Sequence, residues 1–240
     1  MKLLLKVNIL LVLVFLIGLA ASYTVAQRLL LDNARSEIQG NARIMMESAL
    51  AVRAYTVSQI KPLLDTQMHY RFLPQTVSAY AATEYFNNLR KTFPEYSYKE
   101  ATLNPTNPRD RATDWESDVV NQFRGNSNQA EFISSRESPT GTALFLARPI
   151  RINNVSCLEC HSTPDKAPTE MIKLYGGDNG FGGKLDDLIG AQIVSVPVSL
   201  PVHIAENAFR VIITWLGGAF GGILIVANIA VAIVARQRPS

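Results

Sequence analysis

Two apolar segments, one near each end of the chain, limit most strongly how this sequence can fold. The first runs from Val7 to Ala26 and the second from Val211 to Ala235. Their polar residues are few: Asn8, Ser22, Tyr23 and Thr24 in the first, and Thr214, Trp215 and Asn228 in the second. About twenty apolar residues in an α-helix span a hydrocarbon core of roughly 30 Å. We therefore expect two membrane helices with a folded domain between them.

The first segment has one alternative interpretation, a cleaved signal peptide. Lys2 and Lys6 would form its charged region, and Ala20-Ala21-Ser22 is a loose cleavage site. The apolar run is, however, longer than the roughly 7–15 residues of a signal-peptide core. The length favours a retained anchor, and cleavage stays open.

Small residues mark one face of the second segment. Gly217, Gly218, Gly221 and Gly222 lie three, four and five positions apart, which lets another helix approach closely. The candidate partners are the first segment and a second copy of the chain.

The charge distribution argues against nucleic acid as a partner. The net charge is +3, but Lys2, Lys6, Arg236 and Arg238 all flank the apolar segments. Without these four, the 23 Lys and Arg fall to 19, against 20 Asp and Glu. The positive net charge therefore comes from residues that flank the membrane segments and does not indicate a nucleic-acid-binding surface.

The same basic residues predict the topology. By the positive-inside rule both termini lie in the cytoplasm of a two-pass protein of the cell inner membrane, with the main domain periplasmic or otherwise extracytoplasmic. The expected organisation is an anchor over residues 1–26, an outer domain over 27–205, and a second helix with a short tail over 206–240. Few residues follow the second segment, so we expect a homodimer or a membrane partner to receive any signal.

Periodicity between the segments predicts an α+β domain. Helices are expected over 27–64, ending near Lys61-Pro62, over 74–92, and from a cap at Asp110 or Thr113 through Phe123. Strands are expected over 96–103, 131–137, 142–150 and 189–200, the middle two forming a hairpin around 138–141. The simplest arrangement is an antiparallel sheet of four or five strands between long helices continuous with the membrane helices. By analogy this is the layout of a PAS- or Cache-like outer domain.

Both cysteines of the chain lie in one five-residue motif. Cys157-Leu158-Glu159-Cys160-His161 is Cys-x-x-Cys-His, the pattern that attaches haem c. Two thiols add across two vinyl groups on one porphyrin edge, and the next residue then lies beneath the iron as its proximal ligand. We therefore expect one covalent haem c on Cys157 and Cys160, with His161 on the iron.

Two other chemistries for the motif are weaker. A redox disulfide would leave the histidine without a use, and no βαβ pattern surrounds the motif. A structural zinc site usually needs four Cys or His ligands, and the chain has two cysteines and three histidines in all. We find no acid, base or nucleophile set beside the motif, so we do not expect an enzyme.

The sixth iron ligand is not decided by the sequence. His69 is the first candidate because it lies within the domain just before a helix. The other usable side chains are His203, Met45, Met46, Met68 and Met171, and an open position is the further alternative. Residues that could pair with the haem propionates are Arg148, Arg151, Lys166 and Lys173, and those that could pack on the macrocycle are Tyr175 and Phe181.

Several short motifs together resemble a known family. They are Arg53-x-Tyr55, Asn104-Pro105-Thr106-Asn107-Pro108, Trp115-Glu116, Ala147-Arg148-Pro149-Ile150, Cys157 to His161, Gly180-Phe181-Gly182 and Gly190. Over roughly residues 45–200 the chain resembles the haem c-binding PAS-like sensor domain first described in cyanobacteria and also found as the outer domain of bacterial signal transducers. The resemblance implies the same attachment roles for Cys157, Cys160 and His161.

The resemblance has one important departure. In a described member a cysteine on a helix is thought to be the sixth ligand, and this sequence has no third cysteine. The family's redox behaviour is therefore not carried over. A single haem in a PAS-like domain, with helices that run into the bilayer, favours a membrane-anchored sensor of redox state or of a small gas. The alternative function is a single-haem electron-transfer subunit of a respiratory or photosynthetic membrane complex.

Overall fold

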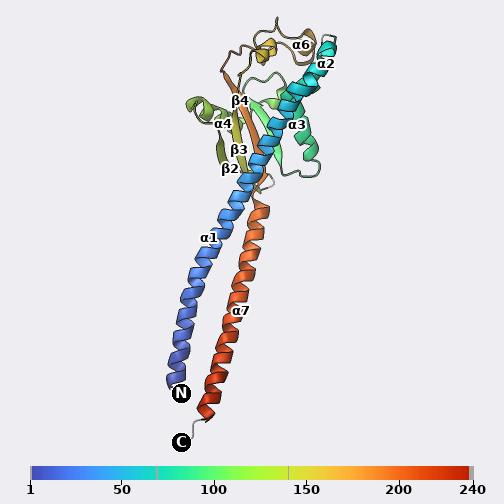
Figure 1. Ribbon diagram of the computed structural model, residues 1–240. Helices are drawn as coiled ribbons and strands as arrows, with labels where there is room; N and C mark the ends of the chain where they lie inside the picture. The colour runs from blue at the N-terminus through green and yellow to red at the C-terminus, as the bar shows by residue number, and fades with distance from the viewer. Residues whose placement is uncertain (1, 69, 140, 238–240) are drawn as a thin grey trace. The chain divides into compact units, whose positions relative to one another are not determined.

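The computed structural model describes residues 2–68, 70–139 and 141–237, which form two units (Figure 1). One unit consists of the N-terminal residues through Glu37 together with the residues from Ser199 onward. The other is Ile38–Val198. A single helix of 54 residues, α1 (Lys2–Tyr55), contributes to both units.

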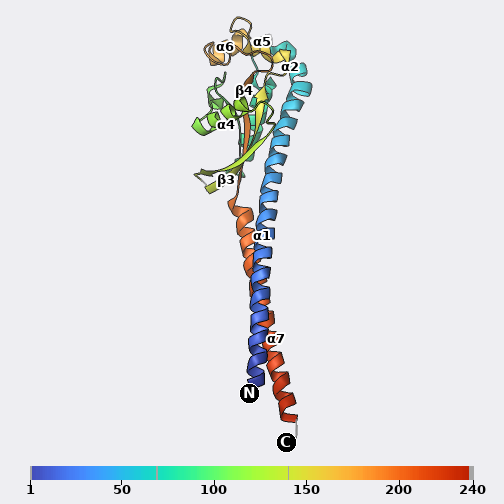
Figure 2. The same cartoon turned by 90° about the vertical axis from the view of Figure 1, so that its left-hand side faces the viewer.

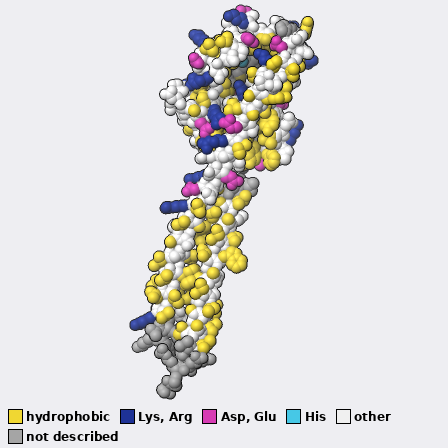
Figure 3. All heavy atoms as spheres, viewed as in Figure 1, with side chains coloured by type: hydrophobic (Ala, Val, Ile, Leu, Met, Phe, Trp, Pro, Cys, Tyr) yellow, Lys and Arg dark blue, Asp and Glu magenta, His cyan; other side chains and the backbone are white. Residues whose placement is uncertain are grey.

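The first unit contains two long helices, the first part of α1 and α7 (Ser199–Gln237). By length and composition, both are long and apolar enough to cross a membrane. Hydrophobic side chains cover both of them in Figure 3. The side-chain amides of Asn8 and Asn228 donate to each other's oxygens at 2.8 and 3.0 Å, so each of these two amides has a partner within the apolar helices. The rings of Phe15 and Phe220 stack in the same interface.

The glycine face of α7 is open. At Gly217, Gly218, Gly221 and Gly222, no described atom lies within 4 Å of the place where a Cβ would be. The first apolar segment therefore packs on α7 without using these glycines.

The second unit has the predicted α+β class. Its helical elements after α1 are η1 (Thr56–Ile60, a π turn), α2 (Lys61–Met68), η2 (Pro74–Thr76), α3 (Ser78–Leu89), η3 (Pro108–Asp110), α4 (Asp114–Gly125), η4 (Val155–Cys157), α5 (Leu158–His161) and α6 (Thr169–Tyr175). Its strands are β1 (Ser97–Thr102), β2 (Phe132–Ser138), β3 (Gly141–Arg151) and β4 (Leu188–Pro197). All three strand pairs are antiparallel, in the order β1-β4-β3-β2.

Alternation along the strands builds a core on each face of the sheet. Leu146 of β3 and Val194 of β4 face α1 and α3, where Ile38, Met46 and Phe86 complete the cluster. Side chains one position away on the same strands face α4, and with it they form the second cluster: Ala101, Val119, Val120, Phe123, Phe145, Ala147, Ala191 and Ile193. Figure 2 shows α1 and α4 on opposite sides of the sheet.

Most of the predicted elements are confirmed. The hairpin pairs Ser138 with Gly141, and α4 begins with a capping box between Thr113 and Glu116, one of the two predicted caps. The expected end of the first outer helix near Pro62 is wrong, because the helix continues through α2. The backbone N–H of Lys61 donates to Thr56 O, five residues back, so the missing N–H of Pro62 falls where the α-helical bonding is already shifted.

Candidate cofactor site

A cavity of about 1270 Å³ lies in the second unit beside the Cys-x-x-Cys-His motif. Cys157, Cys160 and His161 all line it. Small-molecule sites usually measure roughly 300–1,000 Å³. The volume therefore does not exclude a group as large as a porphyrin.

The motif itself folds into two short helical turns. The side chain of Asn154 accepts from the backbone N–H of Ser156 at 2.9 Å, which starts η4, and α5 follows directly. This places both thiols, which form no disulfide, half-buried at the cavity. Burial raises the pKa of the Cys160 thiol.

His161 is held by one ring nitrogen. Its Nδ1 lies 2.8 Å from Gly180 O and 3.5 Å from Thr106 Oγ1. Because a carbonyl oxygen can only accept, Nδ1 carries the proton in this contact, and Nε2 is the nitrogen that can donate a lone pair to a metal. A metal-ligating histidine is commonly fixed in this way by a backbone carbonyl.

The loop that supplies this carbonyl depends on glycine. Gly180 has φ +86°, and a Cβ there would lie 1.9 Å from Thr106 Oγ1 and 2.8 Å from its backbone nitrogen. Gly182 and Gly183 donate their N–H groups to Ser162 O and His161 O, which ties the loop to α5. The loop therefore fixes both the backbone and the ring of His161.

One face of the long helix forms another part of the cavity wall. Arg53, Val57, Lys61 and Asp65 all line the cavity at intervals of four residues. Residues four apart on an α-helix drift by about 40° around its axis. The wider π turn at η1 offsets part of that drift, which helps keep these four side chains on the cavity side.

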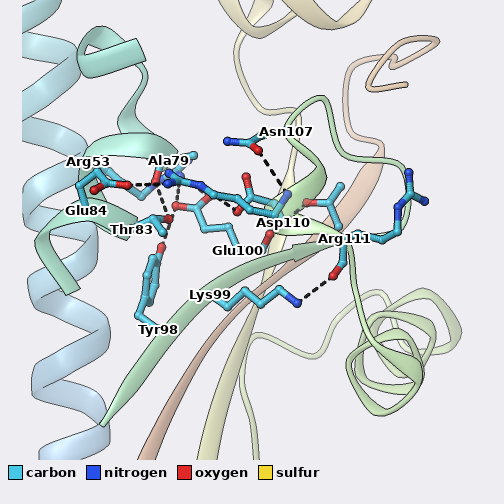
Figure 4. Close-up of polar contacts among 12 residues, drawn as sticks. Arg53, Ala79, Thr83, Glu84, Tyr98, Lys99, Glu100, Asn107, Asp110 and Arg111 are labelled. Carbon is cyan, nitrogen blue, oxygen red and sulfur yellow. Dashed lines mark hydrogen bonds and ion pairs between the residues drawn. The ribbon is translucent and has the colours of Figure 1, made fainter. Parts of the chain in front are cut away.

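Arg53 takes part in a buried polar network of the cavity wall. Its guanidinium contacts both carboxylate oxygens of Glu100, which is 4% exposed on β1. The Tyr98 hydroxyl donates to Glu100 at 2.8 Å and accepts from Gln192 at 3.2 Å. Burial raises the pKa of Tyr98, so its hydroxyl stays a donor. Figure 4 shows Arg53 reaching Glu100 from α1.

Of the candidates for the sixth iron ligand, two methionines lie at the cavity. His69 lies outside the described residues and stays a prediction. Met68 and Met171 line the cavity, but the Met68 sulfur already accepts from Leu73 N and Thr76 Oγ1 at 3.2 and 3.4 Å. Met171 is 4% exposed in a cluster with Phe72.

The remaining candidates lie elsewhere. Met45 and Met46 pack in the core between α1 and the sheet and are not among the cavity-lining residues. His203 belongs to the other unit, where its Nδ1 lies 3.6 Å from Glu206.

Some of the residues predicted to contact the haem propionates and the macrocycle line the cavity, and others do not. Arg151 and Lys166 line the cavity, as do Tyr175 and Phe181. Arg148 instead pairs with Glu47 and Glu131, and Lys173 pairs with Glu170; neither lines the cavity.

Sequence reasoning assigned no site role to Arg53, Lys61, Glu100, Arg109 and Asp110, all of which line the cavity. Two parts of this wall do carry a signal in the sequence, the motifs Arg53-x-Tyr55 and Asn104 to Pro108. These motifs contributed to the family resemblance, but no binding or chemical role was inferred from them.

The residues present fit a covalently attached haem. Two free thiols and an imidazole with its Nε2 available meet at one cavity, which is the donor set that haem c requires. Among residues 2–68, 70–139 and 141–237, no three His, Cys, Asp or Glu side chains come together as an alternative metal site.

Fold and site together define a class of protein: an antiparallel α+β domain on long helices, with a Cys-x-x-Cys-His motif beside a large cavity. The family model Tll0287-like matches residues 31–197, and the chain belongs to the Tll0287-like family, which confirms the predicted resemblance.

A solved structure supports the same fold. The crystal structure of the cyanobacterial heme-protein Tll0287 is similar with a TM-score of 0.51 and 21% sequence identity, over 67% of this chain and 95% of that one. The comparison with curated proteins gives no match.

Proposed function

We propose that this chain is a membrane-anchored mono-haem c protein that senses redox state or a small gas. One haem is attached at Cys157 and Cys160, and His161 is its proximal ligand. The observation that carries the haem assignment is the bond between His161 Nδ1 and Gly180 O, which leaves Nε2 for a metal. The similar structure is that of a heme-protein, which supports the same assignment.

The test of the haem is a visible spectrum of the full chain made in a cell competent for cytochrome maturation. The expected result is a c-type spectrum whose pigment survives acid-acetone extraction, because thioether bonds hold it. The double variant C157A/C160A should lose this resistance. A colourless protein, or pigment that is extracted from the unaltered chain, would overturn the proposal.

The distal side is tested with a matched pair of histidine variants. We propose His69 as the sixth ligand, so His69→Ala should change the spectrum and open the iron to CO. His203→Ala is the control, since His203 lies in the other unit. Identical spectra and CO binding in both variants would remove His69 from the site.

Location and partners are part of the proposal. Two long apolar helices with basic flanks support a two-pass protein of the cell inner membrane, with a PAS- or Cache-like domain in the periplasm. The open glycine face of α7 supports a homodimer, although another membrane protein would fit the same face. Cysteine cross-linking at Gly218 should give a dimer in membranes; cross-links only to other proteins would favour the second partner.

The sensing role is supported by the course of α1. The same helix carries an apolar segment and ends at the cavity wall, where Arg53 is paired with Glu100. A charge change at the cavity then acts on a residue of this helix, and small helix shifts are a common output of switches.

Spin labels test this coupling. Labels on cysteines introduced at exposed Ala54 in α1 and Asp118 in α4 remain selective because the native thiols are consumed by the haem. The distance distribution should change between the oxidised and reduced protein. An unchanged distribution, together with no response to NO, CO or O₂, would contradict the sensor proposal.

The alternative is electron transfer within a respiratory or photosynthetic complex. It is favoured by the incomplete burial of Cys157 and Cys160, which would keep one porphyrin edge near the surface. Fast electron exchange with a co-purifying complex would support it. In either role we propose that the chain is not an enzyme.

A further inference from the structure

Among the carboxylates that line the cavity, Asp110 has a setting that differs from that of Glu100. Asp110 is the last residue of η3, and its side chain is 18% exposed. The cation next to it is Arg109, whose Nε lies 3.8 Å from Asp110 Oδ1. This distance is too long for a hydrogen bond. Figure 4 shows Asp110 beside Glu100 among the polar groups of this wall.

The cations around Asp110 are committed to other acids. Arg109 Nη1 contacts Glu84 Oε1 at 2.5 Å, and its guanidinium lies over the ring of Tyr80. Lys99 of β1 bonds Glu116 at 2.7 Å.

The remaining charged and titratable neighbours do not offset the burial of Asp110. Glu100 adds negative charge, although Arg53 and the Tyr98 hydroxyl hold it, and the Tyr175 phenol of α6 lies in the same neighbourhood. Burial, with a smaller effect of Glu100, outweighs Arg109 and Lys99 and raises the pKa of Asp110 to about 6.

Asp110 shares its cavity and its loop with the proposed haem site. Cys157, Cys160 and His161 line the same cavity. Thr106, four residues before Asp110, lies 3.5 Å from His161 Nδ1. A charge change at the metal would therefore be felt by a carboxylate that no cation fully neutralises.

We propose that Asp110 is the redox-linked proton site of this protein, taking up a proton when the iron is reduced and releasing it when the iron is oxidised. The proposal rests on the proposed haem. For each electron that a one-electron donor delivers, Asp110 accepts up to one proton from water, so the carboxylate becomes a neutral acid as the iron goes from ferric to ferrous. The coupling is reciprocal, so protonation of Asp110 raises the reduction potential.

The test is a redox titration of the full haem-loaded chain in detergent between about pH 5 and about pH 8. The potential should fall as pH rises, most steeply near pH 6, with a slope of at most 59 mV per pH unit, the value of one proton per electron. In Asp110→Asn most of this dependence should disappear. Its potential at about pH 8 should lie above that of the unaltered chain, because the neutral amide mimics the protonated acid.

Two further variants make the result specific. Asp118→Asn removes an exposed carboxylate outside the cavity and should leave the dependence of the reduction potential on pH unchanged. Any part of that dependence that comes from the haem propionates is the same in this variant and in the unaltered chain. Arg109→Gln removes the nearest cation and should move the steep region to higher pH, which tests Asp110 without altering it.

The outcomes separate this inference from the proposed function. A chain without a haem spectrum would defeat the proposed function before any potential is measured. If haem is present but Asp110→Asn keeps the pH dependence of the unaltered chain, or Arg109→Gln leaves the steep region in place, Asp110 is not the proton site. A carboxylic C=O band in the reduced-minus-oxidised infrared spectrum, absent from Asp110→Asn, would confirm the site directly.

Discussion

Two groups of ion pairs hold α1 against the sheet, and they differ in how far their acidic side chains are removed from water. At the cavity, Arg53 of α1 pairs with Glu100 of β1, whose side chain is 6% exposed. Elsewhere on the sheet, Arg148 of β3 pairs with Glu47 of α1 and with Glu131, whose side chains are 63% and 23% exposed.

This difference indicates at which end of α1 a change in charge has the larger effect on stability. Exposed ion pairs contribute roughly 0–1 kcal/mol, because water and salt screen them. A buried pair adds little when intact, but loss of one partner leaves the other charge without water or counter-ion. The cavity end of α1 is therefore the end at which a charge change has a large effect.

The largest effect is expected from breaking the buried pair. Glu100→Ala should lower the free energy of unfolding by about 3–5 kcal/mol, because it leaves the Arg53 guanidinium and the Tyr98 hydroxyl without their acceptor. Denaturant unfolding of the detergent-solubilised chain, followed by circular dichroism, measures the change.

A double variant shows that the effect comes from the orphaned charge. Arg53→Met combined with Glu100→Leu should recover most of the lost stability, since apolar replacement of a buried pair is often neutral. Both arginine side chains are 25% exposed, so a loss under about 1 kcal/mol in Glu100→Ala would mean that water solvates Arg53 once Glu100 is removed, as it solvates Arg148.

Much of the fold could be predicted because it follows local patterns. The apolar run in 142–150 and the turn before it predicted β3 and its hairpin, and the cap candidate Thr113 predicted the start of α4. The passage through Pro62 could not be predicted, because a π turn depends on tertiary packing of the helix rather than on its own residues.

The site was predictable only where its chemistry is contiguous in sequence. Cys157 to His161 form one motif, so their role can be inferred from spacing alone. The contact of His161 with Gly180, and that of Arg53 with Glu100, join residues 19 and 47 positions apart. Such pairs carry no local signal, and only the fold brings them together.

A second prediction concerns Asp110, the carboxylate beside Glu100 whose Oδ1 lies 3.8 Å from Arg109 Nε, too far for a hydrogen bond. Its pKa is raised from 3.8 to about 6, so the folded chain binds this proton more tightly than the unfolded chain does. Its contribution to the free energy of unfolding therefore falls by at most about 3 kcal/mol as pH rises from about 4 to about 6. Above about pH 6 this contribution stays low. Asp110→Asn cannot ionise and should be the more stable protein at about pH 8, with the haem kept oxidised.

The pH pattern identifies the cause of any stabilisation. Well below the unfolded-state pKa of 3.8 the carboxyl is neutral in both states, and the two proteins should unfold at the same denaturant concentration. A constant difference at all pH values would show that the substitution acts through packing and not through the charge of Asp110.

A smaller effect is expected from the exposed group. Glu131→Gln removes a partner of both Arg43 and Arg148, at 3.1 Å from each. The free energy of unfolding should nevertheless fall by less than about 1 kcal/mol, because both arginines remain in contact with water. The same denaturant titration measures it, and a loss approaching that of Glu100→Ala would remove the contrast between the two groups.

Salt gives the smallest effect, and the two groups differ in whether the cost of the substitution depends on salt at all. Raising the ionic strength from about 0.1 M to about 1 M shortens the screening length from about 10 Å to about 3 Å. The cost of Glu131→Gln should shrink toward zero over this range, since screening already weakens the pairs that the substitution removes. The cost of Glu100→Ala should stay the same, because ions do not enter the space between Arg53 and a side chain that is 6% exposed. Parallel salt dependence of the two costs would mean that the cavity wall is as open to solvent as the sheet surface, and α1 would then have no end at which cavity charge is felt more strongly.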